Sequence, residues 1–216
     1  MDPALVRAGR VNEMDFMAEL GKRVGCKDGI WDVKPVSVCM ERTGKPPIGV
    51  RWVEHDKNAG SDPPDVRCRL VVQETKRVTT LDTASDPGAA FASTVPLEAL
   101  RLMFSMHQSR PKPNLLKDNR DDDYVLMLLD ISKAHPHAEQ KRELYTKLPA
   151  EHPCGGDPKL CGLLRMNLYG AKDAGKNFED LIARLSKEAK AKRGSLNSCI
   201  YYQKGRDLSY LVSTLW

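Results

Sequence analysis

The spacing of hydrophobic and polar residues predicts strands in the first third of the chain. Three short runs with strand-like patterning, separated by turns rich in Gly and Pro, cover residues 30–38, 48–54 and 66–73. In the second run Ile48, Val50 and Trp52 fall on one face, as they do in a half-buried strand. We therefore expect an antiparallel β meander from Trp31 to Gln73.

Helical spacing marks other parts of the chain. Apolar residues three and four positions apart predict helices over residues 11–25, 95–107 and 177–192. Thr94 can cap the second of these helices, and Pro96 suits its first turn. The third is the clearest, with Phe178, Leu181 and Leu185 on one stripe.

The remaining apolar runs predict further strands. Tyr124–Ile131 is almost continuously apolar, which is typical of a strand buried on both faces. Residues 132–143 are polar and predict a short helix, and residues 144–148 predict a short strand. Residues 199–202 and 208–215 predict a hairpin. These elements together predict an α+β fold.

Composition narrows the class of protein without naming a function. The chain has 216 residues, of which 41% are hydrophobic and 29% charged, as in one globular domain or two small ones. No apolar run approaches the roughly 18 residues of a membrane span, and the N-terminus lacks the apolar core of a signal peptide. We expect an intracellular protein, in the cytoplasm or nucleus, that is neither secreted nor inserted in a membrane.

Six cysteines without a Cys-x-x-Cys pair are consistent with free thiols in a reducing compartment. The tightest group of possible zinc ligands is His152, Cys154 and Cys161, with His135 and His137 upstream. Its spacing matches no common zinc motif, so scattered cysteines are the favoured interpretation.

The positive charge is concentrated near the C-terminal end of the sequence. Residues 176–206 contain eight basic and three acidic residues, which accounts for the whole net charge of +5. Such a segment could bind a phosphate backbone. From charge alone, a solvated helix face is the preferred interpretation.

Asp130 stands out because it is the charged residue near the end of the apolar run at residues 124–131. A carboxylate beside a buried strand is costly unless it is paired or bound to a metal, and Mg²⁺ prefers such hard oxygen ligands. The alternative is that Asp130 caps a helix that starts near Ser132. On this residue alone the cap is the favoured interpretation.

Several short phrases, taken in order, resemble the reverse transcriptase of copia-type retrotransposons. The family's first strands read roughly Trp-x-Leu-Val, Lys-Trp-Val and Lys-Ala-Arg-Leu-Val. The corresponding segments here are Trp31–Val33, Ile48–Val53 and Val66–Val72, and Phe91–Arg101 resembles the segment that follows them. Later, Leu128–Ala134 resembles Leu-Asp-Val-Lys-x-Ala-Phe, Leu144–Pro149 resembles Val-Tyr-Met-x-x-Pro, and Leu168–Ala174 resembles Leu-Tyr-Gly-Leu-Lys-Gln-Ala.

The resemblance implies a right-hand polymerase that synthesises DNA on an RNA or DNA template-primer from dNTPs. After an N-terminal tail at residues 1–10, it implies a fingers-like subdomain at residues 11–123 and a partial palm-like subdomain at residues 124–216. Two Mg²⁺ ions roughly 3.5–4 Å apart would clamp the reacting oxygens. Asp130 matches the first metal-binding aspartate and is the implied catalytic residue.

The resemblance also implies which residues meet the substrates. The implied nucleotide-binding residues are Arg67, Arg69, Ile131, His135, Tyr169, Gly170 and Asp173. Candidates for nucleic-acid binding are Lys176, Arg184, Lys187, Lys192 and Arg193, and the helix from Asn177 would lie beneath the templating base. Arg67 and Arg69, two apart in a strand, share a face from which a guanidinium could grip two phosphate oxygens. The alternative is that both are merely exposed strand arginines.

The sequence departs from the family at several positions. His135 replaces the aromatic residue that screens out a 2′ hydroxyl, and Asp173 replaces a Gln. Gly175 and Phe178 replace the usual Pro and Trp. Ser213–Trp216 stand where the family has the paired aspartates of Tyr-Val-Asp-Asp. We therefore expect an N-terminal fragment of a degenerate or incompletely annotated element, inactive alone because one carboxylate cannot hold two Mg²⁺ ions. A residual nucleic-acid-binding module and a generic α+β structural domain are the alternatives.

Overall fold

The computed structural model describes residues 1–58, 64–75, 79, 88, 90–109, 130–195, 197–203 and 208–211. The chain folds into two units that alternate along the sequence. Unit 1 comprises residues 1–91 and 133–178, and unit 2 comprises residues 92–132 and 179–216. The predicted α+β class is confirmed. Within the described residues, no helix is both long and apolar enough to span a membrane.

A three-stranded antiparallel sheet in unit 1 joins segments that are far apart in the sequence. Its strands are β1 (Trp31–Pro35), β5 (Leu160–Leu164) and β4 (Tyr145–Thr146), in the order β1-β5-β4. Trp31 is 2% exposed, and its indole N–H donates to Oγ1 of Thr146 across 3.1 Å. A Cβ at Gly162 would lie 2.3 Å from the Trp31 ring, so the ring can lie on β5 only because that position is glycine.

The predicted pair of half-buried strands is confirmed as a hairpin in unit 1. It consists of β2 (Val50–Asp56) and β3 (Val66–Val72), paired antiparallel with Val50 opposite Val72. Half-buried and exposed residues alternate along β2, and the exposed side chains of β3 include both predicted arginines. An isolated bridge between Ile48 and Thr146 connects the start of the hairpin to β4.

The predicted meander from Trp31 to Gln73 is wrong in its first part. After β1 the chain forms α2 (Val36–Thr43), which starts after Pro35. Gly44 caps its C-terminal end in a left-handed conformation with φ +65°. β1 pairs with β5 and not with β2. The β-branched Val36 and Val38 made this segment resemble a strand. The Pro and Gly at its ends are the signals that fit a short helix.

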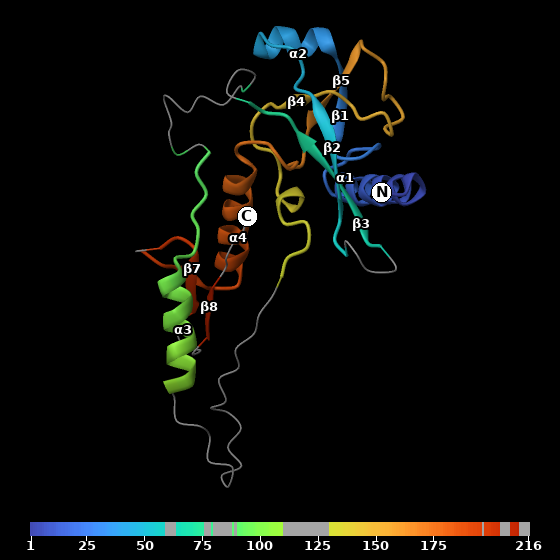
Figure 1. Ribbon diagram of the computed structural model, residues 1–216. Helices are drawn as coiled ribbons and strands as arrows, with labels where there is room; N and C mark the ends of the chain where they lie inside the picture. Colours follow the sequence, from blue (N-terminus) through green and yellow to red (C-terminus); the bar gives the residue numbers. More distant parts are fainter. Residues whose placement is uncertain are drawn as a thin grey trace. The chain divides into compact units, whose positions relative to one another are not determined.

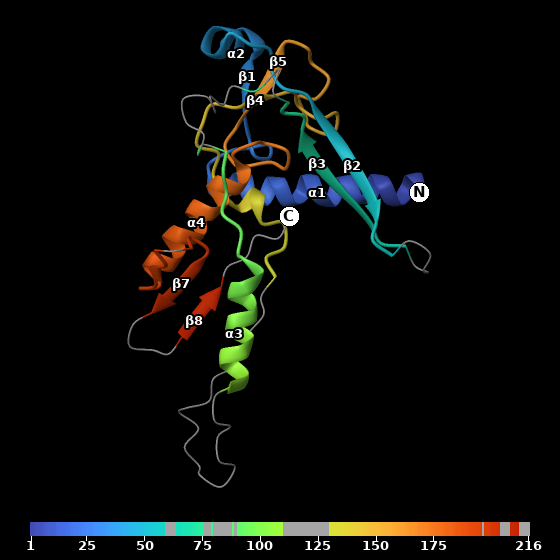
Figure 2. The ribbon, with the colours of Figure 1, turned by 60° about the vertical axis from the view of Figure 1, so that its left-hand side comes forward.

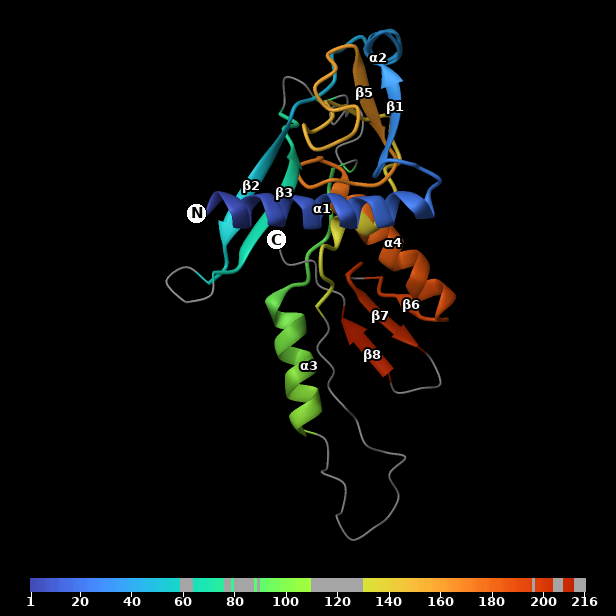
Figure 3. The ribbon, with the colours of Figure 1, turned by 90° about the vertical axis from the view of Figure 1, so that its right-hand side faces the viewer.

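Helix α1 (Pro3–Arg23) is longer than the predicted helix and includes the residues expected to form a tail. Asp2 caps it, since its Oδ1 accepts the Ala4 N–H across 2.8 Å, and Pro3 occupies the first turn. The helix packs across β3 (Figure 1, Figure 3). Its early turns approach the strand through Gly9, where a Cβ would lie 2.8 Å from Sγ of Cys68. That contact uses a small residue and not an apolar stripe, so hydrophobic spacing did not reveal it.

Unit 2 contains the predicted helix and the predicted hairpin near the end of the sequence. Helix α3 spans Leu97–Ser109. Strands β7 (Ile200–Gln203) and β8 (Leu208–Leu211) pair antiparallel (Figure 2). Strand β6 (Lys192–Arg193) pairs with β7 on its other side (Figure 3). Helix α4 spans Ala174–Glu188, close to its predicted range, and the boundary between the units falls after Phe178. Residues 124–129 of the predicted buried strand lie outside the described residues, as do residues 110–123.

His152 is a buried histidine whose ring is used at both nitrogens. Its Nε2 lies 2.8 Å from the Asp28 carbonyl oxygen, and its Nδ1 accepts the Cys154 N–H across 3.1 Å. The ring packs edge-on against Trp31, with 5.5 Å between centroids. An acceptor Nδ1 requires the neutral ring, with the proton on Nε2.

The stability of the protein is therefore expected to fall in mild acid. Burial lowers the pKa of His152, although the Asp28 carbonyl and carboxylate oppose the shift. The folded protein then binds this proton less readily than the unfolded chain, whose histidines titrate near about 6.5. The stabilising contribution is complete above that pH and is lost as the pH falls through the lower folded pKa. Urea unfolding between pH 7.5 and 5 measures this slope.

A His152→Gln variant should show a shallower loss of stability over that range than the wild type. His55→Gln is the matched control, because His55 is exposed on β2. Equal slopes for the wild type and His152→Gln would contradict the assignment of the acid sensitivity to His152.

Candidate functional site

Tyr169 is the centre of a cluster that joins three distant parts of the sequence within unit 1. The Arg69 guanidinium of β3 lies 5.4 Å from the centroid of the Tyr169 ring. The His135 ring, in the short 3-10 helix η2 (His135–His137), meets Tyr169 edge-on with 5.7 Å between centroids. Phe178 of α4 contacts the same imidazole, at 6.2 Å. Three of the predicted nucleotide-binding residues are thus brought together.

The backbone holds Tyr169 against β3. The Val72 N–H donates to the Tyr169 carbonyl across 2.7 Å, and Val71 and Tyr169 form an isolated parallel bridge. Gly170 follows with φ +83°, and a Cβ there would lie 2.2 Å from the Val72 carbonyl oxygen. Only glycine combines this conformation with this approach. The predicted Tyr169–Gly170 pair therefore lies against the edge of the hairpin that carries Arg69.

Burial controls the ionisation of the two rings. It raises the pKa of Tyr169 to about 12, with a further increase from the negative charge of Glu13 and a decrease from Arg69. Burial lowers the pKa of His135. Near neutral pH the phenol of Tyr169 is therefore neutral. The lowered pKa of His135 favours the neutral form of its imidazole. Arg69 supplies the positive charge of the cluster.

The two predicted arginines of β3 share an exposed face, as expected for residues two apart in a strand. Their surroundings differ. The Nε of Arg67 is 3.2 Å from Oδ2 of Asp65, in an exposed ion pair. The Arg69 guanidinium instead lies over the Tyr169 ring. Arg69 is consequently the arginine that belongs to the cluster.

Asp173 is buried, and neighbouring side chains of the protein compensate its charge. Its Oδ1 lies 3.0 Å from Arg142, and its Oδ2 accepts from the amides of Gln140 and Asn177 at 3.0 and 3.2 Å. Arg142 also pairs with Glu74 across 2.6 Å. This arrangement ties the segments after β3, before β4 and at the start of α4. Both carboxylate oxygens of Asp173 therefore already have partners within the protein.

Asp130 and Ile131 are the described end of the predicted buried strand. Both are exposed and lie outside regular secondary structure, with Ile131 45% exposed. The alternative, in which Asp130 caps a helix near Ser132, is wrong, since the helix that follows is η2 and Ala134 occupies its N-cap position. The expectation of a buried setting at these two residues is also wrong.

The donor groups that the structure describes do not assemble a site for two Mg²⁺ ions. Within the described ranges, no group of three or more His, Cys, Asp and Glu side chains could hold a metal ion. Asp130 brings a single carboxylate, and Ser213–Trp216, which stand where the family has its paired aspartates, lie outside the described residues. None of these four residues has a carboxylate side chain, the ligand that Mg²⁺ prefers.

The predicted nucleic-acid-binding residues have different environments. Arg184, Lys187 and Lys192 are exposed in unit 2, whereas Lys176 is half-buried in unit 1. The Arg193 guanidinium pairs with the buried Glu179 and lies 6.0 Å from the Tyr201 ring centroid. Arg193 is thus committed to contacts within unit 2.

The predicted zinc group is not assembled around His152, because both of its ring nitrogens are hydrogen-bonded to backbone groups. All six cysteines are free, as expected. Burial raises the pKa of Cys39 and Cys161, the latter to about 11, so both thiols are protonated at neutral pH.

The structure adds four residues to the site that sequence reasoning missed. They are Glu13, Glu74, Lys133 and Arg142. A charged residue in a polar stretch carries no local sign that its partner lies far along the chain. The one available signal was the polar run at residues 132–143 between two apolar runs, which contains Lys133 and Arg142.

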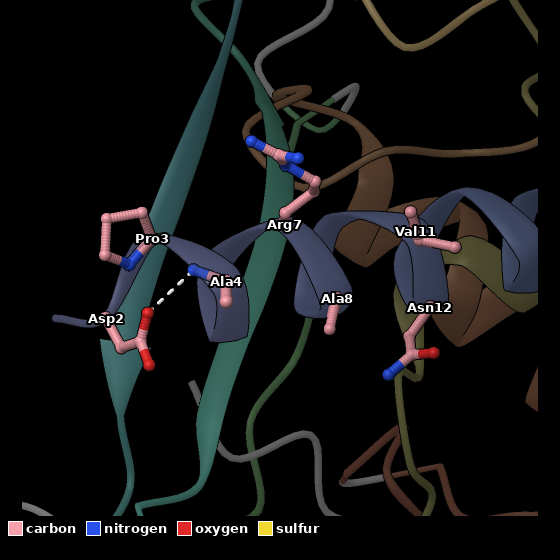
Figure 4. Close-up of a pocket in the computed structure, with 7 residues that line it drawn as sticks. All are labelled: Asp2, Pro3, Ala4, Arg7, Ala8, Val11 and Asn12. Atoms are coloured by element: carbon pink, nitrogen blue, oxygen red, sulfur yellow. Dashed lines mark hydrogen bonds between the residues drawn. The ribbon is translucent and has the colours of Figure 1, made fainter.

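An open pocket along the first three turns of α1 lies apart from these predictions. Seven residues from Asp2 to Asn12 line it, and Figure 4 shows the side chains of Arg7, Val11 and Asn12 among them. None of the residues predicted for nucleotide or metal binding contributes to its lining.

Comparison with known proteins gives one match. Searches of curated proteins and of solved structures return no match. The sequence profile of a family described as reverse transcriptase (RNA-dependent DNA polymerase) matches residues 34–215, which is most of the chain and includes β3, η2 and α4. The chain therefore belongs to the reverse transcriptase family.

Proposed function

We propose that this chain is a copia-type reverse transcriptase domain, with fingers-like residues 11–123 and palm-like residues 124–216, that binds a dNTP beside Tyr169. The observation that supports the proposal is the cluster of Arg69, His135 and Tyr169. These residues come from three separate family-like phrases and meet in one place within unit 1.

Each residue of the cluster has a chemical role in this proposal. Arg69 holds the triphosphate through paired N–H donors, while the Tyr169 ring restricts its orientation. His135 takes the position against the sugar, and Gly170 allows the backbone to approach the nucleotide. Asp173 does not contact the nucleotide in this proposal. It forms an ion pair with Arg142 and supports the site through the protein.

Nucleotide binding is expected to depend on Arg69. Arg69→Ala should weaken the affinity for a dNTP, measured by isothermal titration, by about tenfold or more, because hydrogen bonds to a charged group contribute roughly 1.5–3 kcal/mol. Arg51→Ala is the matched control, because Arg51 is exposed on the neighbouring strand β2. Equal affinity for both variants, or no binding by the wild type, would contradict the proposed site.

We further propose that the chain does not polymerise by itself. It carries Asp130 at the position of the first metal-binding aspartate, but Ser213–Trp216, which include no carboxylate side chain, where the family has its paired aspartates. Primer extension with Mg²⁺ and a labelled primer-template should show no incorporation. Incorporation that disappears in Asp130→Ala would disprove this part of the proposal.

A nucleic-acid-binding module is the second candidate function. The exposed Arg184, Lys187 and Lys192 favour it, because α4 and β6 present them to solvent. Binding to a primer-template should then weaken by roughly one log unit per log unit of salt for each phosphate contact. Absence of a mobility shift at about 50 mM salt would rule out this candidate.

A further inference from the structure

A buried ion pair connects α1 to the segment that carries His135. Glu13 of α1 is 1% exposed, and its Oε2 lies 2.6 Å from Nζ of Lys133. The same ammonium lies 4.1 Å from the centroid of the Phe16 ring, one turn further along α1. A buried carboxylate is tolerated when a cation compensates it, so Lys133 is held where Glu13 requires it.

Lys133 has a backbone conformation that needs such a restraint. Its φ is +54°, in the left-handed region that side chains other than Gly seldom adopt. The residue stands immediately before Ala134 and the helix η2 that presents His135. A strained conformation persists where surrounding contacts determine it, and the two contacts of the ammonium with α1 provide that restraint.

Glu13 also influences the other ring of the cluster. Burial raises the pKa of Tyr169, and the negative charge of Glu13 raises it further. The second oxygen of Glu13, Oε1, has no hydrogen-bond partner within the part of the chain that the structure describes. A further contact between the two segments joins the Phe16 and His137 rings edge-on, at 5.7 Å.

We propose that Glu13 is a positioning residue that acts through Lys133 to hold His135 against Tyr169. This inference rests on the proposed function where it concerns nucleotide binding. It gives α1, which precedes the family match at residues 34–215, a role in the site. Glu13 itself does not touch the substrate. It sets the backbone of the segment that does.

The direct test is the contact between the His135 and Tyr169 rings, followed by NMR as a nuclear Overhauser effect. Glu13→Gln removes the charge and keeps the volume, and it should weaken this signal and reduce dNTP affinity on the order of tenfold. Glu19→Gln is the matched control on the same helix. It breaks the exposed Glu19–Lys22 pair of equal length, 2.6 Å, and should change neither readout.

Two double variants keep the test decisive if Glu13→Gln unfolds the chain. Glu13→Gln combined with Lys133→Gly removes both charges and lets residue 133 adopt a positive φ without strain. Glu13→Gln combined with Lys133→Ala removes the same charges and keeps the strain. The first should retain the His135–Tyr169 signal, and the second should lose most of it.

Three outcomes separate the proposals. Loss of the ring contact and of dNTP affinity in Glu13→Gln supports both. Loss of the contact in a protein that never binds dNTP supports the positioning role and contradicts the proposed function. An unchanged contact in Glu13→Gln, or equal signals from the two double variants, would overturn the positioning role even if the wild type binds dNTP.

Discussion

Arg142→Met is expected to reduce the free energy of unfolding by about 3–5 kcal/mol, because it leaves uncompensated buried charge behind. The Arg142 side chain is 16% exposed and lies between Glu74 and Asp173, whose side chains are 0% and 7% exposed. Met preserves much of the volume, so the loss comes from the two carboxylates and not from a cavity. Urea unfolding followed by tryptophan fluorescence measures it, since Trp31 and Trp52 lie in the same unit.

Two controls separate charge burial from a general loss of arginine. Arg42→Met breaks the exposed pair of Arg42 with Glu143, where water screens the charges, and no measurable change is expected. Adding Glu74→Gln and Asp173→Asn to Arg142→Met removes the uncompensated charges and should recover much of the lost stability. A triple variant no more stable than Arg142→Met would show that the carboxylates are not the cause.

Gly170→Ala is expected to be the second most damaging substitution, with a loss of about 2–5 kcal/mol. The left-handed conformation accounts for about 1–2 kcal/mol of this, and the overlap of the new methyl group with neighbouring atoms for about 1–3 kcal/mol. The Cβ would lie 2.2 Å from the Val72 carbonyl oxygen and 2.7 Å from Cγ1 of Val71, so β3 must move. The same urea unfolding experiment measures the effect.

Gly156→Ala isolates the conformational part of that loss. Its φ is +87°, close to the +83° of Gly170, and a Cβ there meets nothing within 4 Å. The control should therefore lose only about 1–2 kcal/mol. Equal losses at the two glycines would mean that the loop containing Gly170 can move away from β3 at little cost, and Tyr169 would then lack the backbone support described above.

Elements with a regular local pattern were predictable from the sequence. Alternation at Ile48–Trp52 predicted β2, the helical stripe at Phe178–Leu185 predicted α4, and turn spacing predicted the hairpin of β7 and β8. Each signal repeats within a few residues and needs no distant partner. The short α2 was missed because its β-branched residues favour a strand, and only the Pro and Gly at its ends indicated a helix.

The candidate site was predictable only in part. Strand geometry placed Arg67 and Arg69 on one face, and the family resemblance named His135 and Tyr169. Neither could show that the Arg69 guanidinium lies over the Tyr169 ring while Arg67 pairs with Asp65. The burial of Asp173 beside Arg142 was equally hidden, because residues 31 positions apart give no local sign of pairing.

The sequence by itself determined the α+β class, the hairpins, the helix α4 and membership of the reverse transcriptase family, because these depend on local periods and on short phrases in order. Only the tertiary structure decided which charges are compensated and which residues meet. Glu13 finds Lys133 at a separation of 120 residues, and Glu74 finds Arg142 at a separation of 68. Such pairs are selected by the cost of burying an unpaired charge, and burial is a property of the packed chain.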